Sequence, residues 1–322
     1  MLEAKNPVAL FANAIGDHIL ALPAFRALVK LFPKRLTLIC TPSFKQTFFP
    51  EFCHDITCIP EFYWNGKKWE FDIEAVANQL ERCDLLLWLS TWYPPNPEHI
   101  LKLLSPNYSI GFCPGFDINI PPDFNKHMAD LIFDVPLQLS ANLRLEDFAY
   151  PPVFRTANQQ RAREIRNLIS EPMKVMVVHA DTKPQKMWPA DNFRVLVDLF
   201  LERHPEFVVF VVGSHNLRLN AEQYGKRIFL YNKRLALATS LALVGEADLF
   251  LGVDSCMLHA ADLFRVPGVG LFGPTSCVEW GFRFSRHAHI CTEGEMEKIQ
   301  VDEVLEALET LVVNGLSQTT IV

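Results

Sequence analysis

A run of strand, turn, helix and strand between residues 249 and 281 constrains the fold more than any other part of the sequence. It predicts a buried strand over 247–251, a tight turn at Gly252, a helix that starts near Met257, and a second buried strand over 268–272. Two strands joined through a helix are parallel neighbours in an α/β sheet. In an open sheet of this kind, the carboxyl ends of the strands and the starts of the helices form the ligand-binding edge.

Two polar residues at this turn suit a ligand made of sugar and phosphate. The start of a helix offers unpaired N–H groups and a positive dipole, which favour an anion such as a diphosphate. Asp254 can accept hydrogen bonds from sugar hydroxyls, and Ser255 can cap the helix and contact a phosphate oxygen. The alternative is an ordinary strand–turn–helix unit with a serine cap and no ligand, because such turns recur throughout α/β proteins.

The amino-terminal part of the chain shows the same alternation of buried strand and helix. Residues 8–12 and 36–40 predict short buried strands, and 18–32 predicts a helix with an apolar stripe between them. This opening and the run described above predict an α/β protein with doubly wound, Rossmann-like sheets.

The length of 322 residues favours two domains over one. A connector over 145–152 ends in a Pro-Pro pair, and a charged helix over 157–168 follows it. We therefore place the boundary near residue 155, which gives one domain over 1–155 and a second over 156–322.

Composition and charge exclude several classes of protein. Hydrophobic residues make up 49% of the chain and charged residues 21%, which is typical of a globular protein with a sizeable core. The net charge of -7 gives no general attraction for nucleic acid or anionic lipid. The amino terminus lacks a secretory signal, and no run approaches about 18 apolar residues. The sequence thus predicts a soluble cytoplasmic protein without a transmembrane segment.

The cysteines and histidines give little sign of a disulfide or a metal. The eight cysteines have no C-x-x-C spacing, and several lie in apolar strands, Cys40 and Cys113 among them, which favours reduced, buried thiols. His287, His289 and Cys291 alternate and would share one face of a strand. Three potential ligands without a clear fourth are a weak zinc signal. We expect no metal and no cofactor.

Residues 44–71 are unusually aromatic, with an Asn65-Gly66 turn among them. Aromatic rings stack on sugars, so one interpretation is an acceptor-binding surface. The favoured interpretation is a segment folded over the core of the first domain. A Pro-rich loop over 92–97 follows the buried strand predicted over 84–90, at a position where it could line the binding edge.

The motif at the second-domain turn resembles the heptosyltransferase family of glycosyltransferases, glycosyltransferase family 9. It has two parts, Asp254-Ser255-x-x-x-His259-Ala260-Ala261 and Leu271-Phe272-Gly273-Pro274-Thr275. The resemblance implies a GT-B fold, in which two doubly wound domains face each other across a cleft. It also implies a nucleotide-diphosphate sugar donor, typically ADP-heptose, with His259 and Thr275 among the donor-binding residues. The family usually has Gly where this chain has Cys256.

A second resemblance lies in the segment Gly16-Asp17-x-x-x-x-x-Pro23-Ala24. In the family, the Asp of this segment is the catalytic base, and Asp17 matches it. Direct displacement by an acceptor hydroxyl requires a group that accepts its proton, and a carboxylate can do so. The alternative is that Asp17 only caps the helix that follows it.

A third resemblance lies in the loop after the strand over 173–179. The family contacts the donor phosphates with a lysine two residues before Trp-Pro and with a hydroxyl residue, and Lys186 and Thr182 hold these positions. A fixed ammonium stabilises the charge that a diphosphate leaving group gains. Gly213 ends the next strand, where a glycine lets the chain approach a nucleotide closely. Leu217 stands near the position of the family's ribose-binding acidic residue.

The resemblance therefore implies an inverting, metal-independent glycosyltransferase with an acceptor-binding first domain and a nucleotide-sugar-binding second domain. Asp17 would be the base, and the sequence does not name the acceptor, which could be a sugar, a lipid-linked glycan, a protein or a small molecule. A nucleotide-sugar epimerase is one alternative, although no second acid/base set is visible. A non-catalytic binding or scaffold protein is another, favoured by Cys256 and Leu217. A dehydrogenase is disfavoured, because residues 13–17 lack a G-x-G-x-x-G fingerprint.

Overall fold

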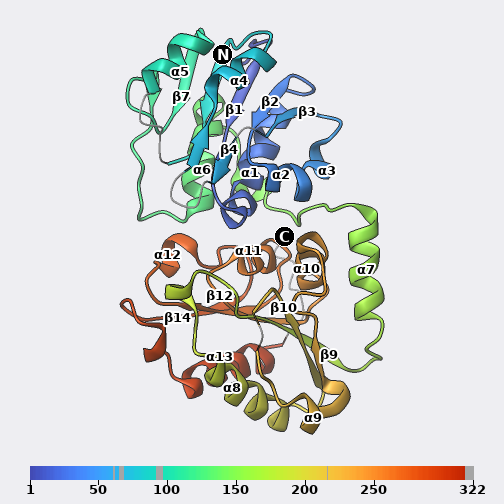
Figure 1. Cartoon of the computed structure of the whole chain (residues 1–322). Coiled ribbons are helices and arrows are strands. Elements are labelled where there is room, and N and C mark those ends of the chain that lie inside the picture. Colours follow the sequence, from blue (N-terminus) through green and yellow to red (C-terminus); the bar gives the residue numbers. More distant parts are fainter. Residues whose placement is uncertain (61, 65–68, 92–96, 216, 316–322) are drawn as a thin grey trace. The chain divides into compact units, whose positions relative to one another are not determined.

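The computed structural model describes residues 1–60, 62–64, 69–91, 97–215 and 217–315, and its chain divides into two compact units (Figure 1). Unit 1 is Met1–Val153 and unit 2 is Phe154–Val322. Each unit is built on its own parallel sheet, which in the described part of the chain has six strands.

The sheet of unit 1 has the strand order β3-β2-β1-β6-β7-β8, and every neighbouring pair is parallel. The chain starts at the centre of the sheet and adds strands first on one side and then on the other, which is the doubly wound arrangement. Its strands are β1 (Pro7–Leu10), β2 (Leu36–Ile39), β3 (Ile56–Ile59), β6 (Leu85–Trp88), β7 (Tyr108–Gly111) and β8 (Ile118–Asn119). Its helices are α1 (Ile15–Leu31), α2 (Pro42–Thr47), α3 (Phe49–Phe52), α4 (Ile73–Gln79), α5 (Pro97–Leu104) and α6 (Met128–Leu139).

The sheet of unit 2 repeats this plan with the order β11-β10-β9-β12-β13-β14, again with parallel neighbours. Its strands are β9 (Lys174–His179), β10 (Phe207–Val212), β11 (Ile228–Leu230), β12 (Leu249–Val253), β13 (Gly268–Phe272) and β14 (His287–Cys291). Its helices are α7 (Thr156–Arg166), α8 (Ala190–Arg203), α9 (Ala221–Tyr224), α10 (Leu237–Val244), α11 (Cys256–Leu263), α12 (Cys277–Trp280) and α13 (Val301–Val313). Short 3-10 helices cover Leu145–Asp147, Pro184–Lys186, Gly225–Arg227 and Met296–Lys298.

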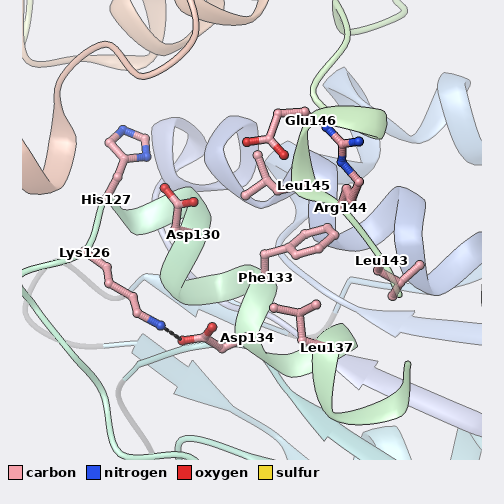
Figure 2. Close-up of a pocket in the computed structure, with 10 residues that line it drawn as sticks. All are labelled: Lys126, His127, Asp130, Phe133, Asp134, Leu137, Leu143, Arg144, Leu145 and Glu146. Atoms are coloured by element: carbon pink, nitrogen blue, oxygen red, sulfur yellow. Dashed lines mark hydrogen bonds and ion pairs between the residues drawn. The ribbon is translucent and has the colours of Figure 1, made fainter. Parts of the chain in front are cut away.

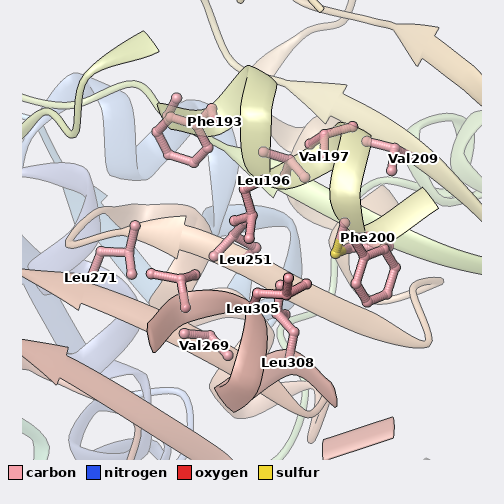
Figure 3. Close-up of a cluster of buried hydrophobic side chains, with 14 of the residues drawn as sticks. Phe193, Leu196, Val197, Phe200, Val209, Leu251, Val269, Leu271, Leu305 and Leu308 are labelled. Atoms are coloured by element: carbon pink, nitrogen blue, oxygen red, sulfur yellow. The ribbon is translucent and has the colours of Figure 1, made fainter. Parts of the chain in front are cut away.

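The core of unit 2 lies between its sheet and the helices α8 and α13 (Figure 3). Phe193, Leu196 and Phe200 project from α8, and Leu305 and Leu308 project from α13, at the spacing of one helical face. All five are buried against inward-facing strand residues. Burial of each such side chain contributes about 1.5–3 kcal/mol. This packing fixes the sheet whose carboxyl edge carries the site.

The turn predicted at Gly252 is wrong. Gly252 lies inside β12 and pairs with His179 on one side and Gly270 on the other. A Cβ atom at this position would lie 2.7 Å from the ring of Phe250 and 2.9 Å from the carbonyl oxygen of His179. The glycine is therefore needed for close packing within the sheet. The strand runs to Val253, so that Asp254 and the residue after it form the turn.

The expectation that the cysteines are reduced is also wrong for one pair. Cys277, the first residue of α12, forms a disulfide with Cys291, the last residue of β14. Because Cys291 is bonded in this way, it does not share a metal site with the histidines of its strand. His287 and His289 stack with ring centroids 4.4 Å apart, and His289 Nε2 accepts the N–H of Phe282. Within the described residues, no group of three or more His, Cys, Asp or Glu side chains is arranged to hold a metal ion.

The aromatic segment folds over the core of unit 1 where its side chains are described. Phe44, Phe48 and Phe52 are buried, and the Phe44 ring packs edge to face on that of Phe25. Further along, β4 (Phe62–Trp64) and β5 (Trp69–Phe71) form an antiparallel pair. The predicted Asn65-Gly66 turn and residues 92–96 of the Pro-rich loop lie outside the described residues. In the described part of the chain, no helix is long and apolar enough to cross a membrane.

Candidate active site

The carboxyl ends of β9 and β12 lie side by side in unit 2, because these two strands are parallel neighbours at the centre of the sheet. Here the strand order reverses direction, which is where open α/β sheets bind their ligands. The loop over 180–189 leaves β9, and Asp254 follows β12 directly. Side chains that are about 70 residues apart in the sequence therefore meet at this edge.

Asp254 is the centre of this site and is 5% exposed. Its Oδ2 atom accepts hydrogen bonds from Lys186 Nζ at 2.5 Å and from Thr275 Oγ1 at 2.8 Å. Its backbone carbonyl accepts the Thr182 hydroxyl at 2.9 Å, and His259 Nε2 lies 3.8 Å from its Oδ1 atom. The structure thus brings Asp254 together with four other residues predicted from the sequence, three at its carboxylate and Thr182 at its backbone carbonyl.

One ammonium and two carboxylates lie close together at this site, those of Lys186, Asp254 and Glu279. The Lys186 side chain is 20% exposed, so its ammonium is paired with Asp254 but remains within reach of a ligand. Glu279, on α12, lies in the same electrostatic environment. Burial raises the pKa of the Glu279 carboxyl, the negative charge of Asp254 adds to this rise, and Lys186 opposes it. Lys186 thus faces the buried carboxylate of Asp254 and the half-exposed carboxylate of Glu279, and its interaction with the buried one is the stronger because less water screens it.

Ser255 stands at the N-cap of α11, but its side chain does not cap the helix as expected. Its Oγ atom lies 3.0 Å from His179 Nδ1 instead. Burial lowers the pKa of the His179 imidazole to about 4, so the ring is neutral near pH 7. The first N–H groups of α11 therefore receive no side-chain cap from Ser255.

Gly213 lies beside the same histidine. Its φ is +105°, which favours glycine, and a Cβ atom here would lie 2.9 Å from Cδ2 and Nε2 of His179. The glycine at the end of β10 is thus required by contact with His179. The sequence predicts a close approach to a nucleotide at this glycine, whereas the close approach that the structure describes is to the side chain of His179.

Two functional candidates at this edge were missed from the sequence, His179 and Asp181. Asp181 Oδ2 accepts the N–H of Ser214 at 2.8 Å and also the Ser214 hydroxyl, which ties the loop after β9 to the loop after β10. Both residues lie at or just beyond the end of a predicted strand, a position that could have identified them. Leu217 is 2% exposed and packs in the core of unit 2, so it presents no polar group to a ligand.

Cys256 is the first residue of α11, where the family pattern has glycine. Burial raises the pKa of its thiol to about 12, and the nearby charge of Asp181 contributes to the rise. The side chain is therefore neutral near pH 7. It adds no negative charge at a helix start that suits an anion.

Asp17 belongs to unit 1 and lies in the first turn of α1, which begins at Ile15, three residues before the predicted start. Its Oδ2 atom accepts the N–H of Ala14 at 3.1 Å, so the carboxylate does stabilise the helix start. The side chain is only partly buried. The adjacent His18 is fully buried, its Nδ1 lies 2.9 Å from the carbonyl oxygen of Ala14, and burial lowers its pKa to about 4. His18 is thus a neutral core residue.

A separate pocket of about 460 Å³ lies beside α6 in unit 1 (Figure 2). Figure 2 shows Phe133 and Leu137 between charged side chains from α6 and from the segment over 143–146. Two of the charges are paired, with Lys126 Nζ 2.7 Å from Asp134 Oδ2. The residues that line this pocket include none of the site residues predicted from the sequence.

The sequence model of glycosyltransferase family 9 (heptosyltransferase) matches residues 125–308, which is more than half of the chain. A search of curated proteins found no match.

Three solved structures share the fold along almost the whole chain. A glycosyl transferase family 9 protein from Veillonella parvula has 18% identity and a TM-score of 0.78, with 98% of this chain and 99% of that chain covered. The E. coli ADP-heptose LPS heptosyltransferase II has 15% identity and a TM-score of 0.68, with 97% and 100% covered. E. coli heptosyltransferase WaaC with ADP has 14% identity and a TM-score of 0.68, with 95% and 99% covered.

The two parallel α/β sheets correspond to those of GT-B heptosyltransferases, as the resemblance predicts. With more than half of its residues matched by the family model, the chain belongs to glycosyltransferase family 9, the heptosyltransferase family.

Proposed function

We propose that this protein transfers heptose from ADP-heptose, or a closely similar nucleotide sugar, to an acceptor hydroxyl with inversion at the anomeric carbon. The observation that carries the proposal is the Lys186–Asp254 pair beside the start of α11. It combines a cation for a diphosphate with a carboxylate for sugar hydroxyls. The solved structures of WaaC with ADP and with ADP-2-deoxy-2-fluoro heptose support a donor of this class.

In this proposal the donor diphosphate binds at the start of α11. Lys186 and the N–H groups of the helix neutralise the charge that develops on the leaving ADP, which is the part that a divalent cation plays in other transferases. Hydroxyls of Thr182, Ser255 and Thr275 lie at the same edge, and on donor binding Thr182 and Thr275 would redirect the one proton that each now donates to Asp254 toward a phosphate oxygen.

The sugar is held by Asp254, whose carboxylate can accept two hydroxyls, with His259 beside it. Gly213 shapes the wall of the site through its contact with His179. Residues 156–322 would therefore form the nucleotide-sugar domain, and residues 1–155 would bind the acceptor.

Asp17 is the proposed general base. A single displacement leaves no covalent intermediate, so the attacking hydroxyl must lose its proton as the new bond forms. An ionised carboxylate can accept that proton, and attack opposite the leaving diphosphate inverts the anomeric centre. The partial exposure of Asp17 is compatible with this role, and its bond to Ala14 fixes the side chain.

A non-catalytic binding protein of the same fold is the second candidate. The observation that favours it is the burial of Leu217, because the position near the family's ribose-binding acid offers no carboxylate here. Such a protein would bind the donor without releasing ADP.

A thermal-shift panel tests the proposal with ADP-heptose, ADP, ADP-glucose, UDP-N-acetylglucosamine and GDP-mannose. At a hundredfold excess over its dissociation constant, a ligand stabilises by about 2.7 kcal/mol, which corresponds to roughly 5–10 °C for a domain of this size. We expect the largest shift with ADP-heptose, and ADP release over a panel of hydroxyl acceptors. Shifts with UDP or GDP sugars alone, or no shift at all, would refute the donor assignment. Donor binding without ADP release for any acceptor would favour the second candidate.

A further inference from the structure

Two cysteines of unit 1 lie close together outside the candidate site. Cys40 directly follows β2, and Cys58 lies within β3, the neighbouring parallel strand. Cys58 pairs with Leu38, two residues before Cys40, so both cysteines lie on the same face of the sheet. Their Sγ atoms are 3.0 Å apart. A disulfide bond is about 2.05 Å long, so the two atoms need to approach by only about one ångström to form one.

The two thiols differ in exposure and in the direction of their pKa shift, as an attacking thiol and a resolving thiol do. Cys40 is buried, and burial raises the pKa of its thiol. Cys58 is partly exposed. A hydrogen bond from Cys40 lowers the pKa of the Cys58 thiol, burial opposes this change, and the positive charge of Lys45 on α2 lowers the pKa further. Cys58 therefore forms the thiolate that attacks, and Cys40 is the thiol that resolves.

We propose that Cys40 and Cys58 form a thiol modification site, a dithiol that is converted reversibly to a disulfide by exchange with a low-molecular-weight disulfide. The Cys58 thiolate attacks one sulfur of the reagent, forms a mixed disulfide and releases one thiolate. Cys40 then attacks Cys58 Sγ, and its proton passes to the departing sulfur, which leaves as the second thiol. The protein loses two electrons and two protons, and the reagent disulfide is reduced to two thiols. This site is independent of the proposed transferase function.

The bond would change the local structure near α1. It would join β3, the edge strand of the sheet, to the end of β2. Cys40 leads through Thr41 into α2, and the Phe44 ring of α2 packs on His18, with ring centroids 5.2 Å apart. Cys40 is thus linked to the first turn of α1 through the backbone at Thr41 and the packing of Phe44 on His18.

Peptide mapping of the full chain tests this inference. The protein is reduced, exposed to oxidised glutathione, and alkylated, and the fragments are sequenced so that Cys53 and Cys58 are separated. We expect a peptide pair linked through Cys40 and Cys58 that is lighter by two hydrogens and is restored by dithiothreitol. In Cys40→Ser, Cys58 should retain glutathione, because the resolving thiol is absent. In Cys58→Ser, Cys40 should stay a free thiol.

Two other sites serve as internal controls. Cys53 is exposed and has no cysteine partner, so glutathione on Cys53 shows that the reagent is active in every sample. Re-formation of the Cys277–Cys291 disulfide after the initial reduction shows that oxidation of the sample is complete. Alkylation of both Cys40 and Cys58 in oxidised wild-type protein, with Cys53 modified, would overturn the proposal. So would an equal amount of glutathione on Cys58 in wild type and in Cys40→Ser.

Discussion

Lys186 Nζ lies 2.5 Å from Asp254 Oδ2, an ion pair between the loop after β9 and the end of β12. The pair places the one cation proposed for the diphosphate against the carboxylate proposed for the sugar. Breaking such a pair at one partner leaves the other charge poorly solvated, so each residue affects the behaviour of the other. Substitution of Lys186 therefore tests the contact with the diphosphate, and substitution of Asp254 tests the contact with the sugar.

Asp254→Asn should abolish the preference for ADP-heptose over ADP. Hydrogen bonds to a charged group contribute about 1.5–3 kcal/mol, so loss of the carboxylate should weaken binding of the sugar nucleotide roughly 10- to 100-fold. ADP itself should bind at least as well as to wild type, because Lys186 no longer shares its charge with a carboxylate. Calorimetric titration with both ligands measures this. Asp302→Asn, which removes an exposed carboxylate from α13, is the matched control. A parallel loss of ADP and ADP-heptose affinity would show that Asp254 does not hold the sugar.

Asp17→Asn should lower kcat about 10²- to 10⁴-fold while leaving the dissociation constant of the donor unchanged. The asparagine carbonyl oxygen can still accept the N–H of Ala14, so α1 should keep its start. Steady-state kinetics of ADP release, with calorimetry for the donor, separates the two effects.

Asp72→Asn is the control for a capping role, since Asp72 Oδ1 accepts the N–H of Ala75 at the start of α4. It should leave kcat at the wild-type value. If Asp17→Asn retained wild-type kcat as well, Asp17 would be a helix cap and another group would be the base.

His18→Leu should make the protein less sensitive to acid. The pKa of His18 is lowered from 6.5 to about 4 in the folded chain, so the unfolded chain binds the proton more readily and stability falls as the pH drops from 6.5 towards 4. At pH 5 this costs about 2 kcal/mol relative to pH 7.5. His179 makes a similar contribution in unit 2. Calorimetric unfolding at both pH values should show a smaller loss for the variant.

The exposed His54 is the matched control for this measurement, because His54→Leu should keep the pH dependence of wild type. Equal acid sensitivity of wild type and His18→Leu would contradict a neutral, buried His18.

The sequence could predict the strands of unit 2 and the residues at their ends. Apolar runs such as 268–272 and 207–212 coincide with β13 and β10, because strands buried on both faces are apolar throughout. Asp254 and Lys186 follow such strands, and parallel strands end at one edge, so their meeting was predictable in outline. Gly252 was misplaced, since a glycine that allows close packing in a strand looks like a turn in the sequence.

Contacts between distant residues could not be predicted. Ser255 was expected to cap α11, but its partner is His179, 76 residues earlier, and nothing local in the sequence indicates that contact. The Cys277–Cys291 disulfide depends on how α12 returns to the end of β14, which is a property of the tertiary fold. Local signals therefore identified the candidate residues, whereas the side-chain network that orients them is set by packing.

Titration of ADP-heptose into wild type, Lys186→Ala and Lys183→Ala is the most direct test of the donor site in unit 2. Lys183 lies three residues earlier in the same loop and is exposed, so its loss changes the net charge equally without touching Asp254. We predict that Lys186→Ala weakens binding roughly 10- to 100-fold, as expected for a charge-assisted contact, and that Lys183→Ala binds like wild type. Wild-type affinity in both variants would contradict the account.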